Sequence, residues 1–376
     1  MGRRRRRLPL RARIAWHGLV RRPPAYRAAP AHIEAVLIAH NLLLGDTLML
    51  TPLLARLRRL HPAARLVMTC PPALLPLYES RPFGLIAVPF DPRDPQSLAR
   101  ARAYGPFDLG IVPGESRHGW FARAAGARWV RGYRGGALYY RASLDEALLM
   151  PAALQPLPDM MAALAGPPAG DDGERFDPAD WPAPASGRFV PPDGPFAVLH
   201  LGAGSPLKYW PAPNWRALAA ALAARGLQVL LSAGPGQEDL ARAVNAAGRY
   251  QDLSGRLSLA DMWHMLAQAR VLVSLDTGIA HLARITQTPA VVLFGPGQAA
   301  LYGAVAFFRD TPFRTVTVAT IPCRNERLLF ERERPWIQTC VRAPRDCAFD
   351  ARCSKTIPVA AVIAATDEVL ENSRRG

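Results

Sequence analysis

The stretch Val198-Leu-His-Leu-Gly-Ala-Gly-Ser-Pro-Leu-Lys-Tyr-Trp-Pro-Ala-Pro-Asn-Trp215 joins a mostly apolar run to a segment with a helix pattern. Residues 196–201 are apolar enough to form a buried strand, and the run breaks at Gly202 and Gly204. Glycines let backbone amides approach an anion closely, and Lys208 follows before the helix pattern of residues 215–225. These features together suit a phosphate or diphosphate. A plain strand-to-helix loop of an α/β domain would show the same pattern, so the stretch alone leaves both interpretations open.

Strand and helix patterns alternate on both sides of this stretch, which is typical of a doubly wound α/β fold. The predicted strands are residues 33–39, 65–69, 84–88, 107–112, 128–133, 196–201, 228–232, 271–275 and 291–294. One predicted helix starts at residue 47. The others cover residues 71–79, 96–104, 117–125, 215–225, 239–247, 258–269 and 358–370.

A chain of 376 residues is long enough for two such domains. The segment 165–195 is dense in Pro, Gly and Asp, as interdomain linkers often are. We therefore predict a basic arm over 1–30, an N-terminal acceptor-binding domain over 31–170, a linker over 171–194, a C-terminal nucleotide-sugar-binding domain over 195–355, and a closing helix and tail over 356–376.

The first thirty residues carry most of the excess positive charge. They hold ten arginines and no acidic residue, which is +10 of the net charge of +16. Such a block is typical of a solvated arm or of a segment attracted to an anionic membrane surface. Nucleic-acid binding is disfavoured because no basic platform interleaved with aromatic residues follows. The arm lacks the apolar region of an export signal, and no apolar run is long enough to span a bilayer. We therefore expect a cytoplasmic protein, peripheral at the inner face of the inner membrane if the arm binds lipid.

The cysteine content and the absence of several catalytic motifs exclude or disfavour some protein classes. Five cysteines do not make a disulfide scaffold. Four of them come late, without a C-x₂-C pair, so we predict reduced thiols and no metal, with a metal knuckle as the alternative; they are Cys323, Cys340, Cys347 and Cys353. The absence of G-x-G-x-x-G, P-loop, G-x-S-x-G and H-E-x-x-H motifs disfavours nicotinamide-dependent dehydrogenases, P-loop NTPases, and the hydrolases and metalloproteases with those signatures.

Polar residues follow several predicted strands, at the sheet edge where open α/β sheets bind ligands. Asp46 comes after the first strand, where it would either cap a helix or present a carboxylate to a ligand. Asp276 repeats this placement, and the amides of residues 277–279 would point outward at a helix start. Gln237 or Glu238 could reach a ribose hydroxyl, or simply begin a helix as acidic residues do.

A basic cluster is predicted near the same edge of the first domain. It consists of Arg117, His118, Arg123 and Arg134. These residues would bind an anionic second substrate or form a solvated surface, and the sequence does not decide between the two.

Four motifs in order resemble glycosyltransferase family 9, the lipopolysaccharide heptosyltransferases. They are Leu44-Gly45-Asp46 with Thr51-Pro52-Leu53-Leu54; Gly202-Ala203-Gly204 with Lys208-Tyr209-Trp210-Pro211; Asp276-Thr277-Gly278-Ile279-Ala280-His281-Leu282; and Thr288-Pro289 followed by Phe294-Gly295-Pro296. The resemblance runs from about residue 33 to residue 370, so only the arginine arm lies outside it. The segment Ile111-Val112-Pro113-Gly114-Glu115 departs from the family's polar motif on the acceptor side.

The resemblance implies an α/β fold of the GT-B type, with two Rossmann-like doubly wound domains facing a cleft. It implies an inverting transferase that needs no cofactor and moves a heptose from ADP-heptose to an inner-core lipopolysaccharide acceptor. In this scheme Asp46 is the general base and Lys208 faces the departing diphosphate. From the basic cluster we predict Arg117 and His118 as the acceptor-binding residues. The donor-binding positions would be Gly202, Ala203, Gly204, Ser205, Glu238, Leu257, Asp276, Thr277, Gly278, Ile279 and His281. The alternatives are another nucleotide sugar or a protein acceptor on the same fold, and a non-catalytic binding protein.

Overall fold

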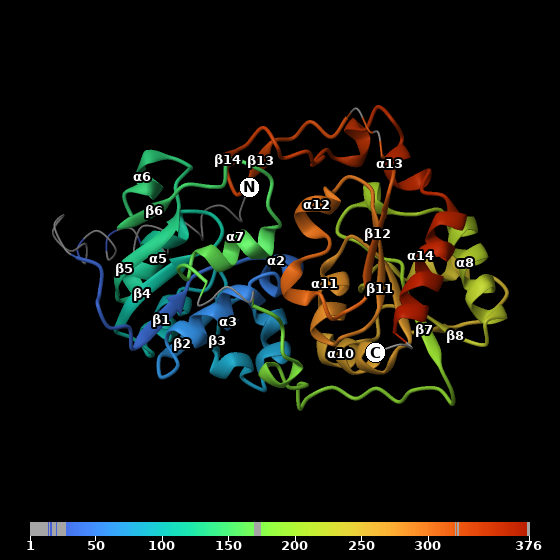
Figure 1. Ribbon diagram of the computed structural model, residues 1–376, viewed down its shortest axis with the longest axis horizontal. Helices are drawn as coiled ribbons and strands as arrows, with labels where there is room; N and C mark the ends of the chain where they lie inside the picture. Colours follow the sequence, from blue (N-terminus) through green and yellow to red (C-terminus); the bar gives the residue numbers. More distant parts are fainter. Residues whose placement is uncertain are drawn as a thin grey trace. The chain divides into compact units, whose positions relative to one another are not determined.

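The computed structural model describes residues 14, 16, 20, 28–168, 174–319, 321 and 323–373. They belong to two compact units, coloured mainly blue to green and yellow to red in Figure 1. Unit 1 comprises Met1–Glu174, Ala179–Pro182 and Leu328–Arg334, and unit 2 comprises Arg175–Pro178, Ala183–Arg327 and Pro335–Gly376. Apart from Ile14, Trp16 and Val20, the predicted arginine arm lies outside the described residues, so its role stays a prediction.

Unit 1 is built on a six-stranded parallel sheet in the order β3-β2-β1-β4-β5-β6. The strands are β1 (Ala35–Ile38), β2 (Arg65–Cys70), β3 (Ile86–Pro89), β4 (Phe107–Val112), β5 (Ala127–Tyr133) and β6 (Glu146–Leu148). The central strands are continuous apolar runs because helices cover both faces of a doubly wound sheet, and Leu37, Val67 and Phe107 are fully buried. The strands predicted from residue 33 to residue 133 are confirmed, whereas β6 was not predicted because it is short and only partly buried.

The helices of unit 1 differ from the prediction at one place near Asp46, where two helices replace one. They are α2 (Leu44–Leu48), α3 (Thr51–Leu60), η1 (Pro72–Tyr78), η2 (Pro82–Gly84), α4 (Ser97–Arg102), α5 (His118–Ala125), α6 (Leu138–Arg141) and α7 (Leu157–Ala163). The prediction of a single helix from residue 47 is wrong, because Pro52 has no amide that could donate to the Leu48 carbonyl and continue the helix. The Thr51 hydroxyl donates to that carbonyl instead, at 2.6 Å. Asp46 therefore lies in the first turn of α2, whose N-cap is Leu43, and is not itself the cap.

Unit 2 repeats the architecture, with a parallel sheet in the order β12-β11-β10-β7-β8-β9. The strands are β7 (Phe196–His200), β8 (Gln228–Ser232), β9 (Gln251–Asp252), β10 (Val271–Leu275), β11 (Ala290–Phe294) and β12 (Phe313–Thr317). The predicted strands are confirmed. The edge strand β12 was missed, because exposed polar residues interrupt its apolar pattern.

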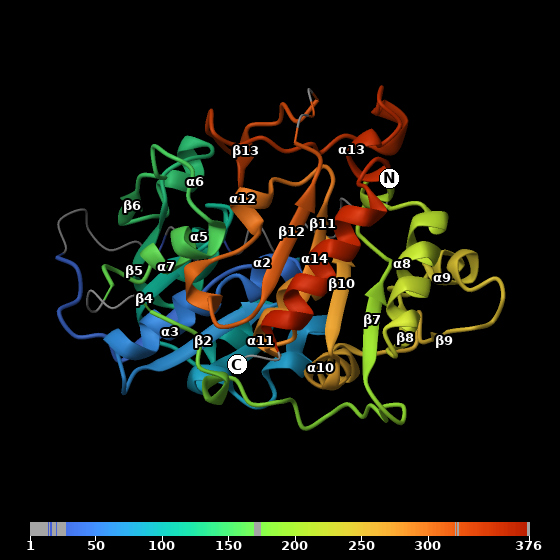
Figure 2. The same cartoon turned by 45° about the vertical axis from the view of Figure 1, so that its right-hand side comes forward.

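The helical segments of unit 2 follow the predicted order. They are η4 (Pro206–Lys208), α8 (Ala212–Ala224), α9 (Glu238–Val244), α10 (Leu259–Gln268), α11 (Gly278–Ile285), α12 (Ala299–Tyr302), η5 (Ala306–Phe308), η6 (Pro344–Asp346), α13 (Arg352–Lys355) and α14 (Val359–Asn372); η3 (Pro178–Asp180) lies in the linker. The closing helix α14 packs on β11 and β12 (Figure 2).

A short antiparallel hairpin, β13 (Leu328–Leu329) and β14 (Arg332–Glu333), belongs to unit 1 although the chain on both sides belongs to unit 2. The sequence predicts these residues to lie in the C-terminal domain, 195–355. They pack instead on unit 1, because the Arg332 side chain is buried among backbone carbonyls of that unit.

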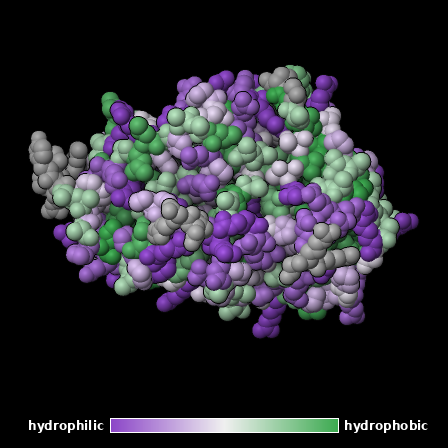
Figure 3. Space-filling view, in the orientation of Figure 1, coloured by the Kyte–Doolittle hydropathy of each residue, from purple (hydrophilic) through white to green (hydrophobic). Residues whose placement is uncertain are grey.

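Within the described ranges, no helix is both long and apolar enough to cross a bilayer. On the face drawn in Figure 3, hydrophilic and hydrophobic residues are interspersed.

Candidate active site

The predicted donor residues gather at one edge of the unit 2 sheet. Parallel strands end at a common edge, so the loops that follow them meet there. The Gly202–Lys208 loop follows β7, residues 233–238 follow β8, Leu257 comes after β9, and residues 276–279 follow β10. The structure thus brings together residues that are up to 79 positions apart in the sequence, from Gly202 to His281.

Lys208 and Asp276 form the centre of this edge. The Lys208 ammonium donates to Asp276 Oδ2 at 2.8 Å and to the Asp276 carbonyl at 2.6 Å. The lysine side chain is 26% exposed and the carboxylate 10% exposed. An ammonium has three donors, so one N–H of Lys208 remains for a ligand oxygen. Gly297 packs on the same carboxylate, since a Cβ there would lie 2.4 Å from Asp276 Oδ2.

The glycine turn is held by Gln237, for which the sequence leaves open a ribose contact or a place at a helix start. Gln237 Nε2 donates to the Ala203 carbonyl at 2.7 Å and to the Tyr209 hydroxyl at 3.0 Å. A Cβ on Gly202 would lie 2.2 Å from Gln237 Oε1, whereas a Cβ on Gly204 would meet nothing within 4 Å. Close packing against Gln237 therefore requires glycine at position 202, whereas the space beside the Gly204 backbone is free for a ligand.

Replacing Gly202 by alanine is expected to destabilise the protein even without ligand. Gln237 would have to move and lose its two hydrogen bonds, each contributing about 1 kcal/mol, so thermal unfolding should occur at a lower temperature. Gly204→Ala is the matched control, because the added methyl group enters open space. Equal unfolding midpoints for the two variants would show that Gln237 does not constrain the turn.

Of three further predicted donor contacts, Glu238 and Ser205 have local hydrogen-bond partners in this structure. Glu238 Oε1 accepts from the Gly236 amide at 2.9 Å, which lowers the pKa of that carboxyl. It also packs against Gly255, whose φ of +71° requires glycine. Ser205 accepts from the Leu207 amide at 3.3 Å and caps η4. Leu257 is half-buried just before α10 and stays a predicted apolar contact.

Helix α11 presents its N-terminus at the same edge. Thr277 is the N-cap, and its side chain makes no capping hydrogen bond. The first amides of an α-helix have no intrahelical acceptor, so those of Gly278 and Ile279 suit an anion. His281 lies one turn further on and is 5% exposed, and burial, with Arg284 and Lys208 nearby, lowers its pKa well below the ordinary value. His281 is therefore neutral, and its Nδ1 faces the Arg284 guanidinium at 3.4 Å.

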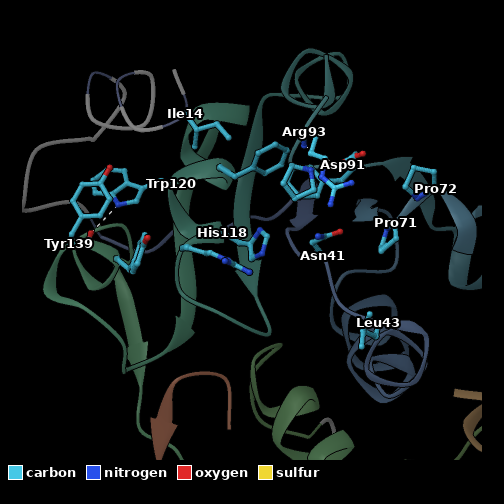
Figure 4. A pocket seen from close by; sticks show the side chains of 15 residues that line it. Ile14, Asn41, Leu43, Pro71, Pro72, Asp91, Arg93, His118, Trp120 and Tyr139 are labelled. Atoms are coloured by element: carbon cyan, nitrogen blue, oxygen red, sulfur yellow. Dashed lines mark hydrogen bonds between the residues drawn. The ribbon is translucent and has the colours of Figure 1, made fainter. Parts of the chain in front are cut away.

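Unit 1 has a cavity of about 540 Å³ at the corresponding edge of its own sheet. Apart from Ile14, the lining residues lie in the segments that follow β1, β2, β3, β4 and β5. The residues are Ile14, Asn41, Leu43, Pro71, Pro72, Phe90, Asp91, Pro92, Arg93, Arg117, His118, Trp120, Phe121, Tyr139 and Tyr140. In Figure 4, Trp120 and Tyr139 lie on one side and Asn41, Asp91 and Arg93 on the other, with His118 between them. Trp120 Nε1 donates to the Tyr139 carbonyl at 2.9 Å, which fixes the aromatic side of the cavity.

The predicted basic cluster is only partly in this cavity. Arg117 is exposed, lines the cavity and pairs with Glu115. His118 lines it too, but burial, with Arg117 beside it, lowers its pKa to about 3, so it is neutral. The surface interpretation of Arg123 is wrong, because its guanidinium is 1% exposed and pairs with Asp145 at 2.6 Å. Asp46 is half-buried in the first turn of α2, three residues after the cavity residue Leu43.

Known proteins share sequence and fold with this chain. Residues 105–324 match the family model described as "Glycosyltransferase family 9 (heptosyltransferase)". The chain belongs to glycosyltransferase family 9. A relative, lipopolysaccharide heptosyltransferase 1 of Pseudomonas aeruginosa, is 35% identical over 155 residues, which cover 38% of this chain and 44% of that protein. The chain thus spans less than half the length of the curated relatives it matches.

Solved structures of family 9 heptosyltransferases share the fold. The E. coli ADP-heptose lipopolysaccharide heptosyltransferase II superposes with a TM-score of 0.66 at 18% identity, covering 91% of this chain and 99% of that one. An E. coli heptosyltransferase with ADP-2-deoxy-2-fluoro heptose gives 0.56 at 21% identity, covering 70% and 90%. The predicted α/β fold of the GT-B type and the predicted family are confirmed.

Several residues that line the unit 1 cavity were not predicted from the sequence. The aromatic side of the unit 1 cavity, Trp120, Tyr139 and Tyr140, lies on two helices whose relation depends on the fold. Asp91 and Arg93 were missed because they sit in a Pro-rich loop without a motif. All five cysteines are free thiols, and no trio of His, Cys, Asp or Glu in the described ranges is arranged to hold a metal ion.

Proposed function

We propose that this protein is an inverting glycosyltransferase that moves a heptosyl group from ADP-heptose to an inner-core lipopolysaccharide acceptor. The single observation that carries the proposal is the Lys208–Asp276 pair beside the N-terminus of α11. It supplies fixed positive charge and unpaired amides where a diphosphate leaving group would gain charge. Membership of family 9 and the complex of a neighbour with an ADP-heptose analogue support the choice of donor.

The proposed transfer reaction makes one bond, breaks one bond and moves one proton. The acceptor hydroxyl oxygen forms a bond to the anomeric carbon, from the face opposite the leaving group. The bond from that carbon to the β-phosphate oxygen breaks, and ADP leaves with the electron pair. Asp46 accepts the hydroxyl proton as general base. Lys208, with its third N–H, and the α11 amides hold the diphosphate as its charge develops.

We assign the acceptor to the unit 1 cavity. Its aromatic side, Trp120 with Tyr139 at a ring distance of 5.3 Å, suits the apolar faces of sugar rings. Two exposed arginines, Arg93 and Arg117, suit acidic groups of the acceptor. The cavity volume of about 540 Å³ lies in the range typical of small-ligand sites.

Two assays test the proposed activity. In a thermal-shift series with ADP, UDP, GDP and CMP sugars, stabilisation should follow the nucleotide that the folded protein binds, and ADP sugars should give the largest shift. Lipopolysaccharide from a strain lacking this gene should gain the mass of one heptosyl residue when incubated with the enzyme and ADP-heptose. Stabilisation by another nucleotide sugar instead would reject ADP-heptose as the donor. Donor binding without a gain in lipopolysaccharide mass would reject the proposed acceptor.

Arg117→Ala is expected to raise the KM for the lipopolysaccharide acceptor about tenfold while leaving ADP affinity unchanged, because it removes one charge-assisted contact. Arg128→Ala is the matched control. Arg128 is also an exposed arginine with one carboxylate neighbour, Asp108 at 3.8 Å, but it does not line the cavity. A similar change in both variants would indicate a general effect of surface charge.

We also infer that the enzyme works at the inner face of the inner membrane, in the cytoplasm. The ten arginines of residues 1–30 would add attraction to anionic lipids. Co-sedimentation with vesicles of anionic or of neutral lipid tests this role. Only the anionic vesicles should bind the protein, and the bound fraction should fall at high salt.

A further inference from the structure

The β13–β14 hairpin is a small element with an unusual place in the chain. It belongs to unit 1, although the residues before Leu328 and after Arg334 belong to unit 2. A two-stranded hairpin is at best marginally stable alone, so side-chain contacts must hold it in unit 1.

Arg332 supplies those contacts. Its side chain is buried, at 3% exposure, and its guanidinium donates to four acceptors. Nη1 donates to the Gly114 carbonyl at 3.0 Å and, within the hairpin, to the Phe330 carbonyl at 2.7 Å. Nη2 donates to Ser116 Oγ at 2.8 Å and to the Tyr133 carbonyl at 2.7 Å. Burial lowers the pKa of Arg332 to about 10, so it stays charged at neutral pH.

The backbone at Gly135 packs closely on the Arg332 side chain. A Cβ on Gly135 would lie 2.3 Å from Arg332 Cγ, and Gly135 has a φ of +155°. The arginine therefore fits between the end of β5 and the Gly114–Ser116 loop, which follows β4.

The loop that Arg332 holds carries one side of the acceptor cavity. Helix α5 begins on it, since the His118 amide donates to the Glu115 carbonyl at 3.2 Å and the Gly119 amide to the Ser116 carbonyl at 2.9 Å. Arg117, the next residue after Ser116, pairs with Glu115 inside the same loop. Gly114 also touches the loop after β1, because a Cβ there would lie 2.9 Å from Leu42 Cδ2. Movement of this loop would displace cavity residues on two elements.

We propose that Arg332 is a positioning residue for the acceptor: it holds the Gly114–Arg117 loop and thereby sets the place of Arg117 and His118 in the cavity. This inference rests on the proposed function, in which the cavity binds the acceptor. The chemistry favours arginine because its planar fork satisfies several carbonyls at fixed angles, which a lysine ammonium does not.

The test compares Arg332→Met with Arg334→Met in the full-length enzyme. Arg334 lies in the same hairpin segment, and its recorded hydrogen bond is to the neighbouring Glu333 carbonyl. Arg332→Met should raise the acceptor KM at least tenfold and leave the dissociation constant for ADP unchanged, while Arg334→Met should change neither. Arg332→Lys should recover part of the loss. Lipopolysaccharide from the deletion strain is the acceptor probe.

Ser116→Ala keeps the test decisive if Arg332→Met does not fold, because it removes only one of the four acceptors. It should raise the acceptor KM by a smaller factor without lowering ADP affinity. An unchanged acceptor KM in Ser116→Ala and Arg332→Met, or parallel loss of ADP affinity and acceptor binding, overturns the positioning role. An unchanged acceptor KM in Arg117→Ala, whose hairpin is intact, instead overturns the assignment of the cavity itself, and the inference with it.

Discussion

Asp46→Ala is expected to abolish heptosyl transfer while leaving ADP affinity nearly intact. Asp46 lies after β1 in unit 1, whereas all the donor candidates lie at the sheet edge of unit 2. A general base typically contributes about 10²–10⁴-fold to the rate, so kcat should fall by that factor. Calorimetric titration with ADP and a transfer assay with saturating acceptor measure the two quantities separately.

The control for this prediction is a second carboxylate, which lines the cavity proposed for the acceptor. Asp91 lines the cavity, and its Oδ1 accepts from the Arg93 amide at 2.8 Å. Asp46→Asn and Asp91→Asn both keep the shape of the side chain and remove the base. If Asp91→Asn loses turnover and Asp46→Asn keeps it, the base is Asp91. Loss of ADP affinity in Asp46→Asn would indicate a structural role for the first turn of α2.

The strands and the donor edge could be predicted because their signals are local. A buried parallel strand is a continuous apolar run, and β4, β8 and β10 begin and end where the sequence predicts. Once the strand ends are known, Asp46, Gly202 and Asp276 must face the carboxyl edges of their sheets. The family motifs then assign chemistry to those positions.

The errors and omissions arise where the outcome depends on distant residues. The ribose contact of Gln237 stays a prediction, but its hydrogen bonds to Ala203 and Tyr209 were missed because these partners are 34 and 28 positions away. Arg332 is 218 positions from Gly114, and no local pattern marks it as buried. Pro52 was visible, yet the predicted helix ran through it because the leucine spacing continues on both sides. Local patterns thus place the backbone better than they place the contacts of individual side chains.

Lys208→Ala is expected to weaken donor affinity and turnover together. Lys208 and Lys355 are the two lysines of the chain, among 44 arginines. Removing one preorganised charge-stabilising donor typically costs about 10²–10³-fold in kcat, and ADP affinity should fall because the same ammonium meets the bound diphosphate. Lys355→Ala is the matched control, since Lys355 also pairs with one carboxylate, Asp350 at 2.7 Å, but at an exposed site.

The double variant Lys208→Ala, Asp276→Ala separates the role of Lys208 toward the donor from its role in the pair. Lys208→Ala alone leaves the Asp276 carboxylate, which is 10% exposed, without its ion-pair partner, and leaving such a group unpaired costs about 1–3 kcal/mol. Removing both groups should restore much of the thermal stability, because contacting residues are not additive. Donor affinity should stay low, since no cation remains to meet the diphosphate. If ADP affinity recovers together with stability, Lys208 only neutralises Asp276, and the α11 amides alone hold the leaving group.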